Sequence, residues 1–361
     1  MTTTATRPIR ARFSAAALRH NHAVARHHAG STRLWSVVKA NAYGHGLERT
    51  VAALADVADG FALIELESAL AMREAGLRQP ILMLEGCYAA EELPSFAEGS
   101  LTPVFHNLAQ VEAFCALPLP VRMPMYLKLN TGMNRLGLNA DELTRALAML
   151  ATTESAGSIT LMTHLADADG LHGVAWQMER LEAMCAGRTL PLSLANSAAL
   201  IRFPETRRDW ARPGIMLYGS SPFADQSADD LGLQPVMTLE SRLISVQNIA
   251  AGERVGYGCL FTAEQPMRIG VVACGYADGY PRQAPTGTPV LVAGRRTRTL
   301  GRVSMDKLCV DLSDLPDCGV GAPVILWGEG LSVDEVARAA GTISYELFCA
   351  LAERVPVSEV D

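Results

Sequence analysis

Eight short apolar runs recur between residues 34 and 219 of the 361-residue chain, and each is followed by a polar or helical segment. The segments between them, such as ESALAMREAGL and ADELTRALAMLATT, combine helical periodicity with residues that strongly favour helix. Eight strands that alternate with helices are typical of a (β/α)8 barrel. The runs span residues 34–39, 60–66, 80–86, 101–107, 124–130, 158–166, 191–197 and 213–219.

The pattern changes after Tyr218. The segment SSPFADQSADDLGLQP is polar and acidic, and from Val236 onward the chain consists of short β-branched runs separated by glycine and proline. One helical segment, SVDEVARAAG, interrupts these runs. We therefore predict a TIM-like (β/α)8 barrel domain over residues 1–233 and a mostly antiparallel β domain over residues 234–361.

Composition and charge exclude several classes of protein. The chain is 49% hydrophobic and 19% charged, which is the balance of an ordinary soluble enzyme with a sizeable core. Its net charge of −7 argues against a nucleic-acid surface. No apolar run approaches the roughly 20 residues of a membrane span, and no secretory signal is evident, so we expect a cytoplasmic protein.

The first part of the chain is basic, with six arginines and no acidic residue before position 39. An arginine-rich, acid-poor segment is also typical of a transit peptide. We favour an amphipathic helix, because the segment runs into the first strand without a cleavage-like break. The predicted apolar face of this helix carries Phe13, Ala16, Leu18 and Val24.

Histidines and cysteines do not form a recognisable metal site. The cluster His20, His22, His27 and His28 lacks the carboxylate or cysteine neighbours and the i, i+4 spacing of a zinc site, so we predict a solvated helix face. The eight cysteines are scattered, with no Cys-x-x-Cys pair and mostly apolar neighbours. We therefore expect buried free thiols and no metal.

Lys39 ends the first apolar run, within the stretch RLWSVVKANAYGHGL. Functional groups of a (β/α)8 barrel lie at the carboxyl ends of its strands, and we expect Lys39 to be the last residue of the first strand. Partial desolvation there would favour the neutral amine, the nucleophile that forms Schiff bases. A purely structural lysine could instead extend from a strand end to solvent. The turn with Asn41, Tyr43 and His45 favours function, because it places a phenol and close-approaching backbone beside the amine.

The segment VVKANAYGHG resembles the cofactor-lysine signature of the alanine racemases, pyridoxal-phosphate enzymes built from a (β/α)8 barrel and a β domain. The resemblance covers essentially the whole chain, because further signatures follow in the order of that family. They are LKLNTGMNRLG, THLADAD, LANSAA, ARPGIMLYG, VGYGCLFTA, GYADGYPR, GRVSMDKLCVD and ISYELF. Each is modest by itself, and together they are specific.

The resemblance implies a site for pyridoxal 5'-phosphate. Lys39 would hold the cofactor as an aldimine, and Arg212 would face its pyridine nitrogen. An arginine cannot accept a proton from that nitrogen, so the ring would be a weaker electron sink than beside an aspartate. Arg135 would contact the cofactor's phenolic oxygen and the substrate carboxylate, and the backbone of Met305 would help to bind that carboxylate. Hydroxyl and N–H donors would surround the phosphate, from Tyr43, Ser197, the backbone of Gly214 and Ile215, and Tyr345.

The same resemblance implies two bases, because a racemase removes and returns a proton on opposite faces of its substrate. Lys39 would be one base. Tyr257 would be the other, contributed by the second chain of a head-to-tail homodimer with shared active sites. An ordinary phenol pKa of about 10 is too high for an efficient base at neutral pH, so cationic or hydrogen-bonding help is needed. His164 would bond Tyr257, and Arg212 would hold His164; a satisfied core histidine is the alternative.

Lys128 resembles a family lysine that is often carbamylated, which would convert a cation into an anion that orients Arg135. Asn130 departs from the aspartate that the family more usually has, and the sequence offers no physical account of that difference. Five further residues match positions that narrow the substrate corridor in relatives, which would restrict the enzyme to alanine. They are Tyr276, Arg282, Arg302, Ile343 and Asp169.

The activity implied is interconversion of L-alanine and D-alanine, either to supply D-alanine for peptidoglycan or in alanine catabolism. A related diamino-acid decarboxylase would share both domains, but VGYG followed by GRVSMD fits racemases better. A non-catalytic pyridoxal-phosphate carrier would lack the β domain after residue 235. A cofactor-free Schiff-base aldolase would not explain Tyr43, Ser197 and Tyr345.

Overall fold

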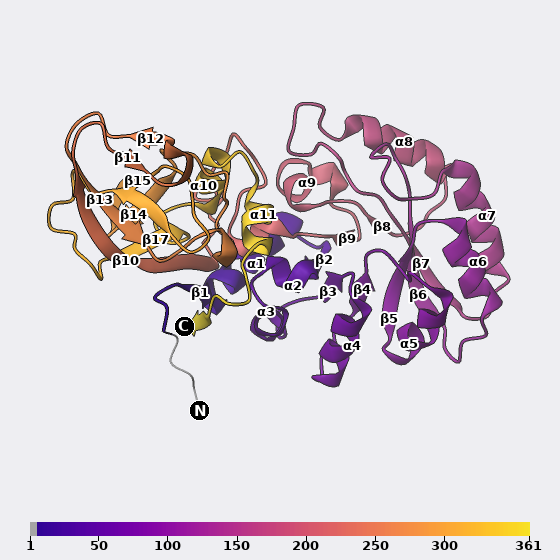
Figure 1. Ribbon diagram of the computed structural model, residues 1–361. Coiled ribbons are helices and arrows are strands. Elements are labelled where there is room, and N and C mark those ends of the chain that lie inside the picture. The colour runs from indigo at the N-terminus through magenta and orange to yellow at the C-terminus, as the bar shows by residue number, and fades with distance from the viewer. Residues whose placement is uncertain (1–5) are drawn as a thin grey trace.

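The computed structural model describes residues 6–361 and contains two domains that lie side by side (Figure 1). One is a closed barrel of eight parallel strands, coloured indigo to magenta, with helices around it. The other, in orange and yellow, is built on a mostly antiparallel sheet. The prediction of a (β/α)8 barrel followed by a mostly antiparallel β domain is confirmed.

The barrel closes where its first and last strands pair in parallel, with Arg33 opposite Trp210. The indole of Trp210 stacks on Trp35 with 4.1 Å between ring centroids, and the Arg33 guanidinium lies 4.2 Å from the Trp210 ring. The strands in order around the barrel are β2 (Arg33–Val37), β3 (Gly60–Leu63), β4 (Ile81–Met83), β5 (Leu101–Phe105), β6 (Met123–Lys128), β7 (Ala156–Met162), β8 (Leu192–Ser193) and β9 (Trp210–Ala211).

One predicted barrel strand is wrong. The run 213–219 contains the 3-10 helix η3 (Ile215–Tyr218), and the eighth strand is β9, which ends before Pro213. All four residues of η3 are buried, and this helix lies against α1 (Ala15–Ala29). A short apolar run that is buried on every side shows no period, so its sequence does not distinguish a strand from a buried helical turn.

Helices connect the barrel strands and cover the barrel. Helix α7 begins with a capping box, in which Asn139 and Glu142 each accept a hydrogen bond from the other's backbone N–H. Within residues 6–361, no helix is long and apolar enough to cross a membrane. Besides α1, the helices are α3 (Leu47–Leu54), α4 (Leu66–Glu74), η1 (Ala90–Glu92), α5 (Leu93–Glu98), α6 (Leu108–Ala116), α7 (Ala140–Ala151), α8 (Ala175–Cys185), α9 (Ser197–Arg202) and η2 (Pro204–Thr206).

The amphipathic helix expected near the start of the chain is α1, but its buried face differs from the predicted one. Phe13 lies in strand β1 (Arg10–Ser14), where side chains alternate between buried and solvent-facing, and Ala16 is exposed. His22 is buried, so the prediction of a solvated histidine face is wrong for this residue. In the part of the chain that the structure describes, no group of His, Cys, Asp and Glu side chains could hold a metal ion.

Strand β1 belongs to the sheet of the second domain, although residues 1–233 were all assigned to the barrel. It pairs antiparallel with β10 (Met237–Ile249) and parallel with β18 (Val357–Val360). Arg10 and Arg12 both form ion pairs with Glu240 across the first of these pairings. Residues 1–5 of the predicted barrel domain lie outside the described residues. The described chain therefore passes from this sheet into the barrel and back, which ties the two domains together.

The second domain has the strand order β13-β16-β15-β14-β17-β10-β1-β18, and β10 also pairs with β13. Helix α11 (Ser344–Cys349) lies on its barrel side, against the short helix α2 (Lys39–Tyr43). The remaining elements are the hairpin β11 (Arg254–Val255) and β12 (Phe261–Thr262), the strands β13 (Met267–Val272), β14 (Pro289–Val292), β15 (Arg295–Leu300), β16 (Leu308–Asp311) and β17 (Pro323–Trp327), the 3-10 helices η4 (Tyr257–Cys259) and η5 (Tyr276–Asp278), and α10 (Val333–Ala339).

Candidate active site

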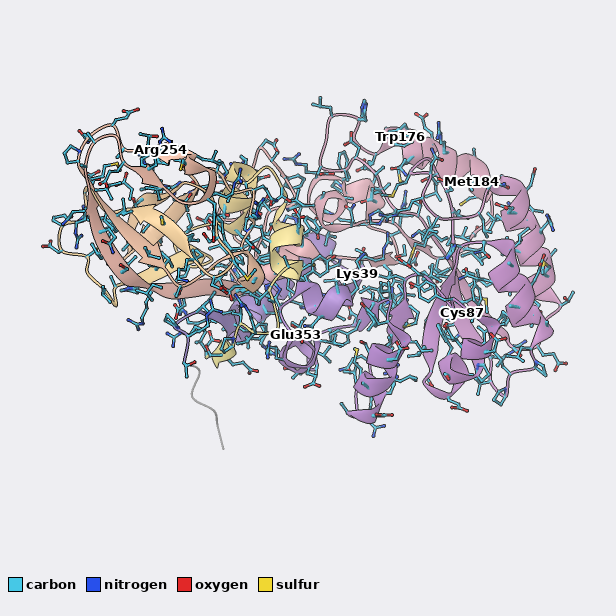
Figure 2. The ribbon with its side chains drawn as sticks, in the orientation of Figure 1. Lys39, Cys87, Trp176, Met184, Arg254 and Glu353 are labelled. Carbon is cyan, nitrogen blue, oxygen red and sulfur yellow. The ribbon has the colours of Figure 1, made fainter. Side chains whose placement is uncertain are left out.

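A pocket of about 610 Å³ lies at the carboxyl ends of the barrel strands, beside α11 of the β domain. Figure 2 shows Lys39 in the middle of the molecule, where the two domains meet. The volume is within the range of small-molecule sites. Eleven of the predicted site residues line this pocket: Lys39, Tyr43, Lys128, Arg135, His164, Asp169, Ser197, Arg212, Gly214, Ile215 and Tyr345.

Lys39 stands at the start of a left-handed turn. The prediction that it ends the first strand is wrong. Strand β2 ends at Val37, and the backbone then takes positive φ angles of 51° to 54° at Ala40, Asn41, Ala42 and Tyr43. Such a conformation costs roughly 1–2 kcal/mol for each residue that is not glycine. Four strained residues in succession persist only where the surrounding structure holds them, and such strain is typical of functional sites.

Tyr43 extends from this turn into the pocket. Its ring stacks on Tyr218 at a centroid distance of 4.8 Å and lies 5.9 Å from the ring of Tyr345. A Cβ on Gly214 would lie 2.5 Å from the Tyr43 hydroxyl oxygen, so only glycine fits there without a shift. Burial raises the pKa of both Tyr43 and Tyr345, so both hydroxyls are neutral hydrogen-bond donors.

Two short helices bring further donors to the same side of the pocket. Ser197 is the first residue of α9, and Gly214 immediately precedes η3. The Gly214 N–H donates to the Ser197 hydroxyl over 2.9 Å, which leaves the hydroxyl proton of Ser197 for another acceptor. Hydroxyls and the N–H groups of a first helical turn suit a compact anion such as phosphate.

Positive charge dominates the pocket. Its charged lining residues are Lys39, Lys128, Arg135, Arg212, Glu85 and Asp169. Lys128 is buried at the end of β6, and this burial, followed by the charges of Arg212 and Arg135, lowers its pKa to about 8. The four cations outnumber the two carboxylates, so the pocket favours an anionic ligand.

Arg212 is fixed to the barrel backbone. It donates to the carbonyls of Ser193, Thr163 and Leu194 over 2.7, 2.6 and 3.1 Å, and to the Ser193 hydroxyl over 2.7 Å. Burial lowers the pKa of Arg212 to about 10, which leaves it charged at neutral pH. Burial, and then the charge of Arg212, lowers the pKa of His164 well below its ordinary value. His164 is therefore a neutral imidazole beside a fixed cation.

Asn130 shapes the loop that carries Arg135. Its side-chain oxygen accepts from the N–H groups of Gly132 and Asn134 over 3.1 and 3.0 Å, and its amide donates to the Asn134 side chain over 3.1 Å. An aspartate could accept the first two bonds but could not donate the third. Asparagine at this position therefore adds one hydrogen bond within the loop.

Six predicted site residues do not line the pocket of a single chain, and all lie in the β domain. Tyr257 and Met305 are 72% and 54% exposed. Figure 2 shows Arg254, just before Tyr257 in the chain, at the end of the β domain far from Lys39. One chain alone therefore does not bring Tyr257 to Lys39. The six residues are Tyr257, Tyr276, Arg282, Arg302, Met305 and Ile343.

Several pocket residues were not predicted from the sequence. Glu85 follows β4, and the position after a barrel strand could have indicated it. Cys349 lies on α11 and lines the pocket, and both Cys349 and Cys259 are exposed, so the expectation of buried thiols is wrong for these two. No sequence pattern placed Cys349 beside Lys39, because they are brought together by contact between α11 and α2. The other such residues are Val37, Ala40, Ile64, Leu84, Leu136, Met162, Asn196, Ala198 and Pro222.

The fold and this pocket define an enzyme with a lysine at the mouth of a (β/α)8 barrel, surrounded by groups that bind an anion. Residues 13–222 match the family profile described as alanine racemase, N-terminal domain, and residues 236–358 match the alanine racemase C-terminal domain. The chain therefore belongs to the alanine racemase family, which makes it an amino-acid racemase, an isomerase.

Individual alanine racemases are similar to this chain over nearly the whole length of both proteins. The chain is 57% identical over 355 residues to the alanine racemase of Thiobacillus denitrificans, which covers 98% of this chain and 96% of that one. It is 50% identical to the catabolic alanine racemase of Klebsiella aerogenes, with 98% and 99% covered. The biosynthetic alanine racemase structure from Pseudomonas aeruginosa has a TM-score of 0.96 at 48% identity, with 99% and 100% covered. The structure from Bartonella henselae, with covalently bound pyridoxal phosphate, has a TM-score of 0.87 at 28% identity, with 98% and 99% covered.

Proposed function

We propose that this enzyme interconverts L-alanine and D-alanine with pyridoxal 5'-phosphate held in the barrel pocket on Lys39. The observation that carries the proposal is the convergence of Lys39, three further cations and several hydroxyl donors in one pocket. The relatives supply the substrate, since they are named alanine racemases, and the Bartonella structure supplies the cofactor.

The residues present fit this cofactor. Tyr43, Ser197 and Tyr345 offer neutral hydroxyls to its phosphate, and Gly214 allows the close approach of backbone. Arg212 stays charged and fixed, so it would face the pyridine nitrogen as a donor and could not accept its proton. When bound, the cofactor supplies the electron-withdrawing system that acidifies the α-proton of the amino acid.

The chain's own residues hold the substrate and move its proton. Arg135 binds the substrate carboxylate, with help from the backbone of Met305. Lys39 takes or returns the α-proton at its Nζ on one face, and the hydroxyl of Tyr257 does so on the other. Neutral His164 accepts a hydrogen bond from that hydroxyl, and the adjacent charge of Arg212 favours the phenolate.

A second copy of the chain supplies Tyr257 in this proposal. Tyr257, Tyr276, Met305 and Ile343 are exposed apolar side chains on the β domain, and such residues are typical of an interface. In a two-fold dimer each chain gives these residues to its partner's pocket and receives the same set in return, so two equivalent sites form. Arg282, Arg302 and Asp169 would then narrow the corridor to the pocket.

Lys128 is the residue of this pocket that we expect to be modified. With its pKa lowered to about 8, part of its amine is neutral at physiological pH. The neutral nitrogen can attack the carbon of CO2, forming a carbamate and releasing one proton. The resulting anion would lie near Arg135 and the buried Arg212, and it would offset their positive charges. A carbonyl resonance from 13C-bicarbonate that is absent from Lys128→Met would detect it.

The activity serves either the supply of D-alanine for peptidoglycan or alanine catabolism. One of the relatives is named catabolic and one of the structures biosynthetic. Both are similar to this chain over nearly its whole length, and both roles require the same reaction.

Borohydride trapping and a substrate panel test the proposal. Purified protein supplied with pyridoxal phosphate should become coloured, and borohydride reduction followed by peptide mapping should place the label on Lys39. Single enantiomers of small amino acids, followed by chiral chromatography, should show alanine turned over fastest. A label on Lys128, a colourless protein or a preference for another amino acid would contradict the proposal.

A further inference from the structure

The left-handed turn α2 contains no glycine, so contacts outside the turn must hold it. Four backbone hydrogen bonds close the turn: the N–H groups of Ala42, Gly44, His45 and Gly46 donate to the carbonyls of Val38, Ala40, Ala42 and Asn41 over 2.9, 3.0, 3.0 and 3.0 Å. The last carbonyls of a helical turn have no N–H donor within the turn, so they need donors from elsewhere. Here the Ala42 carbonyl already accepts from the His45 backbone N–H over 3.0 Å, so the Tyr43 carbonyl is the one that needs an outside donor.

The side chain of His45 supplies that donor. Its Nδ1 lies 2.9 Å from the Tyr43 carbonyl oxygen and 3.1 Å from that of Ala42. Both partners are acceptors only, so Nδ1 carries the hydrogen and donates it. The ring is 1% exposed and is held between Tyr218, stacked at 4.6 Å, and Phe348, edge-on at 4.7 Å.

The surroundings of the other ring nitrogen, Nε2, keep the imidazole of His45 neutral. Nε2 is buried and has no hydrogen-bond partner among the described residues. A second proton there would be an unpaired buried N–H, which is costly. Burial accordingly lowers the pKa of His45 to about 4, and the ring stays neutral. His45 therefore acts by holding backbone and not by transferring protons.

We propose that His45 is a positioning residue, whose Nδ1–H fixes the Ala42 and Tyr43 carbonyls and thereby the left-handed turn that aims Lys39 and Tyr43 into the pocket. The inference rests on the proposed function for what the turn aims at. Helix α11 shares in the arrangement, because a Cβ on Gly44 would lie 2.0 Å from the Phe348 carbonyl oxygen. His45 thus joins the lysine turn to the helix that carries Tyr345.

Two substitutions separate the donor from the ring. His45→Phe keeps a buried ring and removes the donor, whereas His45→Asn loses the ring and keeps an N–H near the position of Nδ1. His22→Phe is the matched control. His22 is also buried, its Nε2 is also unpaired, and burial also lowers its pKa to about 4, but it lies on α1 among Arg19, Arg26 and Asp59.

We expect His45→Phe to weaken pyridoxal phosphate binding and to lower kcat by roughly tenfold or more, because small misplacements of reacting groups are costly. KM for alanine should change by less than about threefold, since the substrate contacts are intact. In the cofactor-free variant, amide hydrogen exchange at Gly44 and at the backbone N–H of position 45 should accelerate. His45→Asn should restore most of each property, and His22→Phe should match the parent.

Unchanged exchange, or faster exchange with unchanged cofactor affinity and kcat, in His45→Phe would overturn the inference. A His45→Asn variant as defective as His45→Phe would also overturn it, because the donor would then not be what matters. If His45→Phe does not fold, amide exchange at Gly44 and at position 45 of His45→Asn decides the question. Parental rates support the inference, and faster rates overturn it. A parent protein that binds no pyridoxal phosphate would contradict the proposed function, while the exchange result would still judge the turn.

Discussion

Gly214 lies so close to Tyr43 that one added methyl group would collide with the phenol. The Cβ of an alanine there would be 2.5 Å from the hydroxyl oxygen. Overpacking of this kind typically costs about 1–3 kcal/mol, so Gly214→Ala should weaken pyridoxal phosphate binding roughly 5- to 150-fold in a fluorescence titration. Gly319→Ala is the control, because its Cβ would meet no atom within 4 Å. Equal affinities in the two variants would contradict the phosphate position proposed here.

Tyr257 has a different test, because its role concerns one face of the substrate only. If Lys39 and Tyr257 serve opposite faces, Tyr257→Phe should abolish steady racemisation and leave solvent deuterium exchange into one alanine enantiomer largely intact. Mass spectrometry of each enantiomer incubated in deuterium oxide measures this directly. An equal loss of exchange from both enantiomers would count against the division of labour.

At the scale of elements, helix α8 reaches the active site through one buried amide. The side-chain nitrogen of Gln177 donates to the Thr131 hydroxyl over 2.8 Å and to the His164 carbonyl over 3.1 Å. Its side-chain oxygen accepts from the Ala166 N–H over 2.6 Å. One residue of α8 therefore fastens both the segment after β6 and the segment after β7.

Gln177→Leu should remove these bonds and leave the Ala166 N–H without its partner. We expect a loss of about 1–3 kcal/mol in the free energy of unfolding, measured with urea, together with a lower kcat. Gln247→Leu offers a control, since Gln247 is exposed on β10 and bonds Ser245. Its effect should stay within about 0.5 kcal/mol. Similar losses for both variants would show that Gln177 does not brace the site.

At the scale of the whole molecule, stability should depend on pH through buried histidines. Burial lowers the pKa of both His22 and His45 to about 4 in the folded chain, from an ordinary 6.5. Between these values the unfolded chain binds more protons than the folded one, so the free energy of unfolding should fall as pH falls from 6.5 to 4. His22→Phe removes one such group, and its urea midpoints at pH 7 and pH 5 should differ less than the parent's. A larger difference would refute this account.

Subunit exchange tests the shared active site. Lys39→Ala and Tyr257→Ala chains should each be inactive alone, but in a mixed dimer one site collects both lesions and the other collects neither. Random pairing makes about half the dimers mixed, so roughly a quarter of wild-type activity should return if the two sites act independently. Mass-tagged subunits verify that exchange has occurred. No activity after verified exchange would mean that Tyr257 serves its own chain or is not the second base.

The sequence by itself determined the barrel, the β domain and most of the barrel's site residues. Alternating apolar runs and helical segments are local patterns, and each run ends near the carboxyl face where function gathers in this fold. Lys39 was found in this way, whereas Tyr43, Lys128, His164 and Arg212 were named by the resemblance of the matched signatures. Their residue types also indicated the chemistry, because amines, hydroxyls and guanidinium groups in one place suit an anionic cofactor.

Only the tertiary structure decided how these residues are held. The left-handed turn after Val38 contains no glycine that would have indicated it. It is held by contacts among His45, Tyr218 and Phe348, which no local sequence pattern connects. Strand β1 joins the second domain by pairing with β10 and β18. These partners lie more than 220 residues further along the chain, so local sequence pattern did not predict the pairing. The run 213–219, which contains η3, was wrongly predicted as a strand because a run that is buried on all sides shows no period by which a strand could be recognised. The exposure of Tyr257 fits the proposed dimer, in which this residue would serve the partner's pocket.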